Sequence, residues 1–116
     1  MIISREEKDN FLILHIEGEV DVYNAYELRN EINRAIEEKC FNVVIDLKNV
    51  SYIDSSGLGV LVSGVKTLMN HKGSLKLVEL NEKIRSLTKL TGLEKFFEIY
   101  DNIQDALTKP SPNNEA

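Results

Sequence analysis

Two adjacent hydroxyls stand at a turn whose residue types suit phosphate chemistry. The segment 53–59, Ile-Asp-Ser-Ser-Gly-Leu-Gly, lies between a stretch typical of a buried strand and one typical of a helix. The first N–H groups of a helix have no partner within the helix, so a helix entrance attracts anions. A phosphoryl group on either serine would be stabilised there and would add about −1.5 to −2 charges to the surface. The pattern therefore indicates a phosphorylation switch.

Nucleotide-binding loops are an alternative that the spacing disfavours. Residues 59–67 resemble GxxxxGK[ST], but one extra residue stands before Lys66. One extra residue turns a helical side chain by about 100° and moves it by about 1.5 Å, so the lysine and its neighbour would not face a phosphate together. The glycines of residues 57–64 also miss the GxGxxG spacing of dinucleotide loops. We therefore expect no bound nucleotide cofactor.

A serine hydrolase or a metal site is also disfavoured. A serine at a strand-to-helix turn resembles a nucleophile elbow, but such a serine needs a base. The two histidines are His15, within a predicted strand, and His71, about 20 Å along the helix axis from the turn. Asp21, Asp46 and Asp54 supply carboxylates without the paired spacing of metal ligands. We expect no catalytic residue and no metal.

A purely structural role for the turn remains open. Asp54, Ser55 and Ser56 could simply end the strand and cap the helix, with Gly57 easing the turn. One side chain is enough for a cap, so this interpretation leaves one of the hydroxyls unexplained.

The elements that must position the turn follow from the hydrophobic pattern. Alternation and short β-branched runs predict strands at 11–16, 42–47, 75–80 and 97–100. Steps of three and four predict helices at 24–39, 57–70 and 82–90, and a closing helix that Asp101 caps and that runs through Leu107. In the helix 82–90, Asn81 is the expected cap, and Ile84, Leu87 and Leu90 are expected to face inward. Strands that alternate with helices predict an α/β fold with a mixed sheet, in which the N-terminal strands pair antiparallel.

Composition sets the class of protein and its surroundings. The chain has 116 residues, of which 42% are hydrophobic and 28% charged, which is typical of one soluble globular domain. The net charge of −5, with dispersed basic residues, argues against binding to nucleic acid or to an anionic membrane. A single cysteine, no secretion signal and no long apolar run predict a cytoplasmic location. The segment 109–116, with two prolines, is predicted to be a disordered tail.

Two motifs, at residues 51–68 and 17–28, resemble a known family. "SYIDSSGLGVLVSGVKTL" and "EGEVDVYNAYEL", in this order and at this separation, look like the bacterial anti-sigma factor antagonists, which are stand-alone STAS domains. The likeness extends from about residue 3 to 108 and includes the later segment 73–101. The resemblance implies a single STAS-type domain over residues 1–108, with a mixed sheet and helices packed mainly on one face.

The resemblance implies a regulator and not an enzyme. Unphosphorylated, such a protein binds an anti-sigma factor that is also a serine kinase, and this binding frees the sigma factor. The kinase uses ATP to phosphorylate one serine, the complex dissociates, and a protein serine phosphatase resets the switch. The alternative is a STAS adaptor or scaffold subunit, such as a transporter partner, that is never phosphorylated. Two hydroxyls favour the switch, and we expect the free protein to be a monomer.

The site residues are carried over from the family's motifs. The modified hydroxyl directly follows the aspartate, which is Ser55 here; Ser56 is the better-placed cap and the second choice. The implied partner-binding residues are Asp21, Tyr23, Asn24, Asp54, Ser56, Gly57, Ser63 and Lys66. A dianion buried against a docked partner without a basic counterpart costs several kcal/mol. We expect Asp54 to hold the serine or the turn by hydrogen bonds, and Gly57 and Gly59 to keep the surface low.

Overall fold

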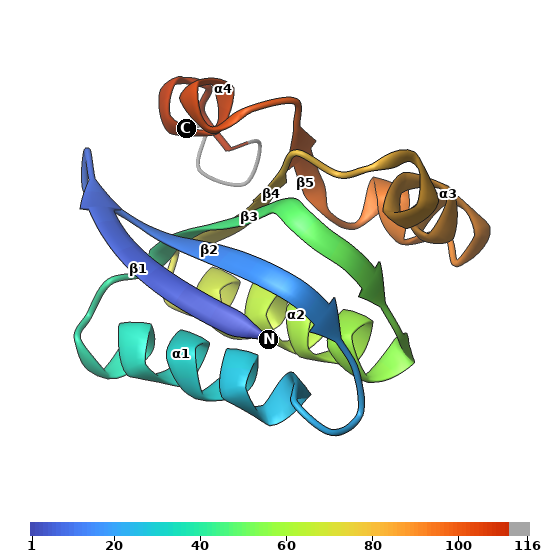
Figure 1. Cartoon of the computed structure of the whole chain (residues 1–116). Coiled ribbons are helices and arrows are strands. Elements are labelled where there is room, and N and C mark those ends of the chain that lie inside the picture. Colours follow the sequence, from blue (N-terminus) through green and yellow to red (C-terminus); the bar gives the residue numbers. More distant parts are fainter. Residues whose placement is uncertain (112–116) are drawn as a thin grey trace.

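The computed structural model describes residues 1–111, and within them five strands form one sheet in the order β1-β2-β3-β4-β5 (Figure 1). The strands are β1 (Ile2–Lys8), β2 (Phe11–Val20), β3 (Asn42–Ile53), β4 (Ser74–Val78) and β5 (Glu98–Tyr100). The helices are α1 (Ala25–Glu37), α2 (Ser55–Asn70), α3 (Glu82–Leu90) and α4 (Ile103–Thr108), with a short 3-10 turn at Leu93–Lys95.

The sheet is mixed because its first connection is a tight hairpin and the later ones are helical crossovers. β1 pairs antiparallel with β2 through the two-residue turn Asp9-Asn10, where both residues have positive φ. This is the geometry that a two-residue hairpin loop requires. β2, β3, β4 and β5 then pair in parallel. The predicted α/β class and mixed sheet are confirmed.

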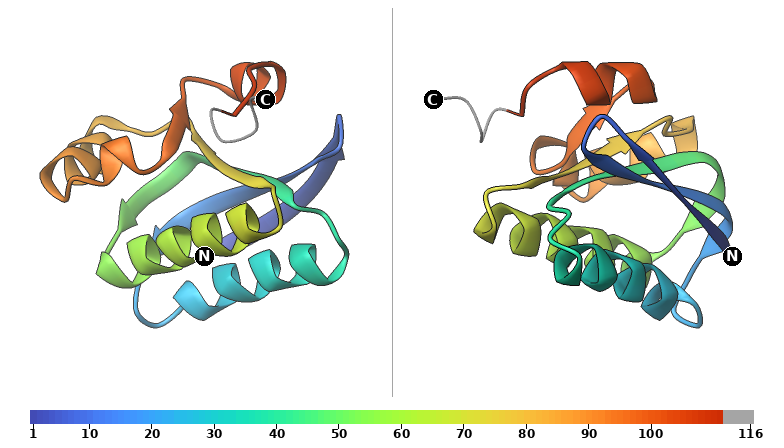
Figure 2. Two further views of the ribbon diagram at one scale, coloured as in Figure 1. Left: turned by 180° about the vertical axis from the view of Figure 1, so that it is seen from behind. Right: turned by 90° about the vertical axis from the view of Figure 1, so that its left-hand side faces the viewer.

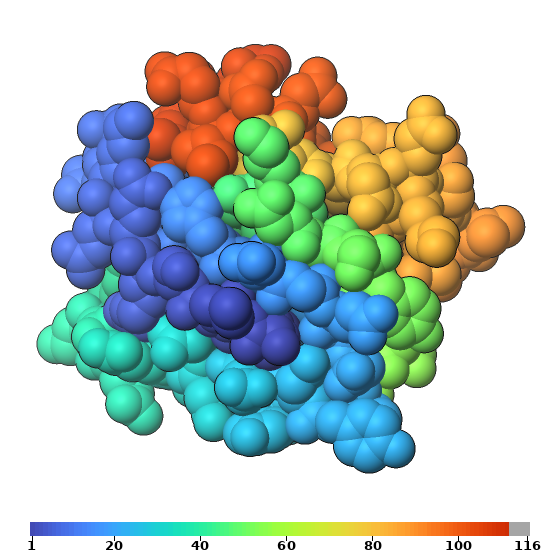
Figure 3. Space-filling view, viewed as in Figure 1, coloured from blue at the N-terminus to red at the C-terminus, as the bar shows by residue number. Residues whose placement is uncertain are grey.

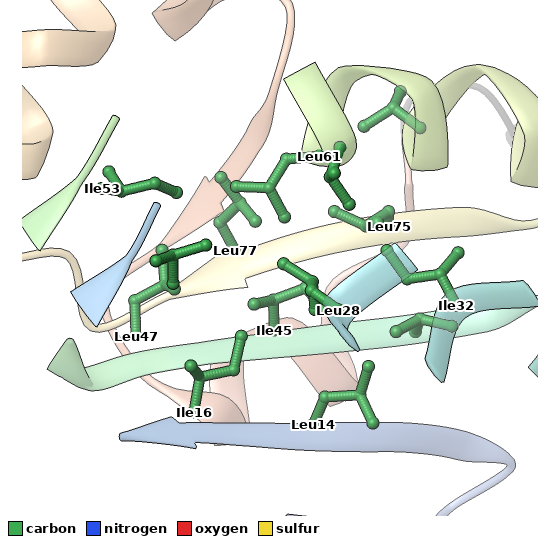
Figure 4. Close-up of a cluster of buried hydrophobic side chains, with 14 of the residues drawn as sticks. Leu14, Ile16, Leu28, Ile32, Ile45, Leu47, Ile53, Leu61, Leu75 and Leu77 are labelled. Carbon is green, nitrogen blue, oxygen red and sulfur yellow. The ribbon is translucent and has the colours of Figure 1, made fainter. Parts of the chain in front are cut away.

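The main core lies between the sheet and the two long helices. α1 and α2 lie side by side under one face of the sheet (Figure 2). Their inward residues, such as Leu28, Ile32 and Leu61, point toward the strand residues Leu14 and Ile45 (Figure 4). This continuous apolar cluster confirms that the helices cover mainly one face of the sheet.

The short helix α4 covers part of the opposite face and is held there by a buried lysine. Lys76, only 2% exposed, donates to the carbonyl oxygens of Ala106 at 2.7 Å and Lys109 at 2.8 Å. Its ammonium group also lies 5.0 Å and 5.1 Å from the ring centroids of Phe11 and Tyr100. Burial lowers the pKa of Lys76, an effect that Glu98 partly opposes.

The packed chain continues past the predicted domain end at residue 108. Ser111 is buried and donates to the Glu98 carboxylate at 3.1 Å. The rest of the predicted tail, 112–116, lies outside the described residues. Among the described residues, no helix has the length and apolar character needed to cross a membrane.

Several predicted boundaries need correction. β2 and β3 run to Val20 and Ile53, well beyond the predicted ends at 16 and 47, and α2 begins at Ser55 instead of 57. Asn102, and not Asp101, caps α4, because its side chain accepts from the Asp105 N–H at 2.8 Å. The Asn81 cap is confirmed by a 2.8 Å bond from the Ile84 N–H. Leu90 was expected to face inward but is 85% exposed.

Candidate functional site

The site is built where two neighbouring strands end at the same edge of the sheet. β2 and β3 stay paired to their last residues, Val20 opposite Ile53, and the Asp54 N–H donates to the Val20 carbonyl at 3.1 Å. The loop after β2 and the turn into α2 therefore meet. Figures 1 and 3 show the β2–α1 loop in light blue beside the start of α2 in light green.

Asp54 organises this junction through both oxygens of its carboxylate. Oδ1 accepts from the N–H groups of Ser56 at 2.9 Å and Gly57 at 3.1 Å, which makes Asp54 the N-cap of α2. Oδ2 accepts from the Val22 N–H at 3.1 Å, in the opposing loop. The sequence-based expectation that Asp54 holds the turn is confirmed. Ser56, predicted to be the better-placed cap, does not cap the helix.

The loop before α1 has its own set of local hydrogen bonds. Asp21 Oδ1 accepts from the N–H groups of Tyr23 at 2.9 Å and Asn24 at 3.2 Å. In return, Asn24 Oδ1 accepts from the Asp21 N–H at 2.9 Å, and its amide donates to the Glu19 carbonyl at 2.9 Å. Asp21 and Asn24, two of the predicted partner-binding residues, therefore hold this loop in place by hydrogen bonds.

Ser55 is the first residue of α2, and its side chain faces solvent. Its hydroxyl makes no hydrogen bond to any residue of the range 1–111 that the structure describes. Because Asp54 already occupies the N–H groups of Ser56 and Gly57, the helix entrance offers an anion fewer free donors than the sequence suggested. Ser55 is thus an accessible hydroxyl on a rigidly held turn, next to a carboxylate.

The two glycines of the turn have different roles. Gly57 is buried, and a Cβ there would lie 2.6 Å from Ile53 Cγ1 and 2.8 Å from Val20 Cγ1. It therefore lets α2 pack closely on the strand ends and does not offer the open partner surface that the sequence predicted. Gly59 is exposed, and a Cβ there would meet nothing within 4 Å.

The remaining predicted contact residues extend along α2. Ser63 and Lys66 are both exposed. Lys66 follows Ser55 by about three turns, so it lies on the same stripe of the helix, about 16 Å further along the axis. Ser63 is offset from that stripe by about a quarter turn.

Exposed apolar side chains that the sequence did not single out surround the junction. Val22 is 64% exposed and Tyr26 57%, beside the predicted contact residue Tyr23 at 86%. Exposed aromatic side chains of this kind are enriched at protein–protein interfaces. Exposure in the folded chain is the signal that identifies Val22 and Tyr23 in the loop and Tyr26 in the first turn of α1.

The histidines are engaged away from the serines. His15 lies between two carboxylates, with Nδ1 2.7 Å from Asp46 Oδ2 and Nε2 2.7 Å from Glu6 Oε1. Partial burial lowers the pKa of His15, but the hydrogen bonds and charges of Glu6 and Asp46 together outweigh it, so that the pKa is raised. His71 stacks on Phe41 with ring centroids 4.5 Å apart. Neither is hydrogen-bonded to Ser55 or Ser56, and residues 1–111 contain no group of three or more His, Cys, Asp or Glu side chains placed to hold a metal ion.

Comparison with known proteins agrees with this fold and identifies the family. The sequence profile of the STAS domain family matches residues 3–106. An anti-sigma F factor antagonist of Paenibacillus polymyxa is 33% identical over 92% of this chain and 92% of its own. An anti-sigma-B factor antagonist of Bacillus subtilis is 39% identical over 81% of this chain and 85% of its own. The crystal structure of an anti-sigma factor antagonist from Mycobacterium paratuberculosis, 30% identical, superposes with a TM-score of 0.83 over 92% of this chain and 91% of its own. The chain therefore belongs to the STAS domain family, and its relatives include anti-sigma factor antagonists.

Proposed function

We propose that this chain is an anti-sigma factor antagonist that is switched off by phosphorylation of Ser55. In the unphosphorylated form it binds an anti-sigma factor that is also a serine kinase, and so frees a sigma factor for transcription. Phosphorylation dissociates the complex, and a protein serine phosphatase restores the active form. The chain itself catalyses no reaction, and it acts in the cytoplasm, where transcription takes place.

The observation that carries the proposal is the position of the Ser55 hydroxyl. It is exposed, makes no hydrogen bond within residues 1–111, and stands on a turn that Asp54 ties to the loop before α1. A kinase can therefore reach the hydroxyl without unfolding the turn. Ser56, the second choice, is only partly exposed.

The partner surface that we propose surrounds this hydroxyl. It consists of the loop held by Asp21 and Asn24, the exposed side chain of Tyr23, the turn at Asp54 and Ser56, and the stripe of α2 with Ser63 and Lys66. Gly57 supports this surface from beneath. A partner that docks flush against it would bury a phosphate on Ser55 beside the Asp54 carboxylate. Two anions in one desolvated interface oppose binding strongly.

The test is a binding measurement with charge variants at Ser55. We expect Ser55→Asp to bind the anti-sigma factor kinase from the protein's own genome at least about tenfold more weakly, about 1.4 kcal/mol, in titration calorimetry. Ser55→Ala is expected to bind like the parent. Ser4→Asp, which adds the same charge at an exposed position on β1, is the matched control. Equal binding by all variants would instead favour an adaptor that phosphorylation does not control.

A further inference from the structure

An apolar groove of about 840 Å³ lies between α3 and the junction that carries Ser55. One wall is the end of β3 and the start of α2, and the other is the face of α3 that looks toward it. The lining apolar side chains are Tyr52, Ile53, Leu58, Ile84, Leu87 and Leu90. Asp54 and Ser55 lie at the same groove, so the switch hydroxyl belongs to its boundary.

The α3 wall carries an apolar stripe that is longer than the core beneath it. Ile84 is buried, Leu87 is half-buried and Leu90 is 85% exposed, although all three follow one helical periodicity. A helix normally buries such a stripe against another element. Here the far end of the stripe has no apolar cover among residues 1–111, and Tyr52 on the opposite wall is also 43% exposed.

We propose that this groove, with Leu87 and Leu90 on its α3 wall, receives the apolar ridge of an amphipathic helix of the anti-sigma factor. The inference rests on the proposed function and extends the binding surface from the Ser55 turn across to α3. The groove adjoins that turn, so a partner held at Ser55 and Asp54 already lies at the mouth of the groove. The anti-sigma factor is therefore the occupant that we propose. A helix that presents apolar side chains at i, i+3 and i+4 is the usual occupant of such a groove.

The groove also gives the phosphate a second way to act. A dianion on Ser55 would stand at the mouth of an apolar channel, where a partner's aliphatic side chains would have to be buried against it. Desolvation of an unpaired charge opposes this burial. Glu82 and Lys83 line the α3 side with one charge of each sign, so they suit the polar margins of an amphipathic helix.

The test compares two exposed apolar positions in binding to the anti-sigma factor kinase. Leu90→Asp is expected to raise the Kd for the kinase at least about tenfold, because the bound partner would bury an unpaired carboxylate in the apolar groove. Ile2→Asp, at a side chain that is 60% exposed on β1, is expected to bind like the parent. Both substitutions are at exposed side chains, and circular dichroism and thermal unfolding confirm the fold. Leu90→Gln, without a charge, replaces Leu90→Asp if the latter unfolds, and should also weaken binding.

The outcomes separate this inference from the proposed function. If the parent binds and Leu90→Asp and Leu90→Gln bind equally well, the groove is not part of the interface and the inference is wrong, while the proposed function stands. If the parent does not bind the kinase, the proposed function fails and the inference fails with it. A dimer of the free chain that Leu90→Asp abolishes would assign the groove to a second copy and overturn the inference. Methyl NMR shifts at Leu58, Leu87 and Leu90 on addition of kinase would support it directly.

Discussion

The carboxylate of Asp54 and the backbone N–H of Val22 form a 3.1 Å hydrogen bond between segments that are 32 residues apart in the sequence. The same carboxylate caps α2 through its other oxygen. One side chain therefore fixes the loop before α1 and the turn that carries Ser55 in a single rigid unit. The proposed anti-sigma factor kinase would dock on a surface that is already ordered, so that less conformational entropy is lost on binding.

Asp54→Asn should separate the two tasks of this side chain. An amide has one acceptor oxygen, so it can cap α2 or accept from Val22, but not both. We expect a loss of about 1 kcal/mol in unfolding free energy, measured by urea denaturation, with faster hydrogen exchange at the Val22 amide. Asp21→Asn is the control, because Asp21 uses only Oδ1 in the bonds that hold the loop. An equal loss in both variants would contradict the role assigned to Asp54.

Gly57→Ala and Gly59→Ala should change stability in opposite directions. A methyl group at residue 57 would collide with Val20 and Ile53, and we expect a cost of about 1–3 kcal/mol. At residue 59 there is open space, and replacing a helical glycine by alanine should stabilise by about 0.5–1 kcal/mol. Chemical denaturation of the two variants checks both signs. A stabilising Gly57→Ala would show that the strand ends and α2 are not closely packed.

Much of the fold could be predicted because the core elements carry regular periodicities. The helix 82–90 was predicted with its bounds and its cap, since Asn81 and the apolar spacing both mark it. The far ends of β2 and β3 were missed because alternation breaks there. Register shifts occur between His15 and Glu17 and between Gly18 and Glu19, so exposed and buried residues no longer alternate simply. Pairing between the two strands, which the local sequence does not show, extends them to Val20 and Ile53.

The turn was predicted only where local chemistry determines it. The hydrogen bonds of Asp54 that cap α2 join residues that are close to one another in the chain. The role of Ser56 was misjudged because Asp54 and Ser56 are both residue types that can cap a helix. The geometry shows that it is the Asp54 carboxylate that accepts from the first free N–H groups of α2. The exposed end of α3 and the groove depend on how β3, α2 and α3 pack. Periodicity places Leu90 on an apolar face but does not say how far the core beneath it extends.

Stability should depend on pH through His15. Its raised pKa means that the folded chain binds the proton more tightly than the unfolded chain does. The contribution is fully present below the unfolded pKa of about 6.5 and is lost as pH rises through the folded value. A neutral imidazole has a single N–H donor, so it cannot donate to both Glu6 and Asp46.

Urea denaturation of the parent and of His15→Gln, at a series of pH values from about 5.5 to about 8, measures this contribution. The stability advantage of the parent over the variant should shrink as pH rises. An advantage that stays constant or grows with pH would show that the charged imidazole does not stabilise the fold.

Mapping of the phosphate after incubation with the anti-sigma factor kinase and ATP tests the central claim most directly. Intact-mass and peptide analysis should find one phosphate, on Ser55, in both the parent and Ser56→Ala, and none in Ser55→Ala. A phosphate that remains in Ser55→Ala, or that maps to Ser56 alone in the parent, would contradict the assignment of Ser55 as the switch.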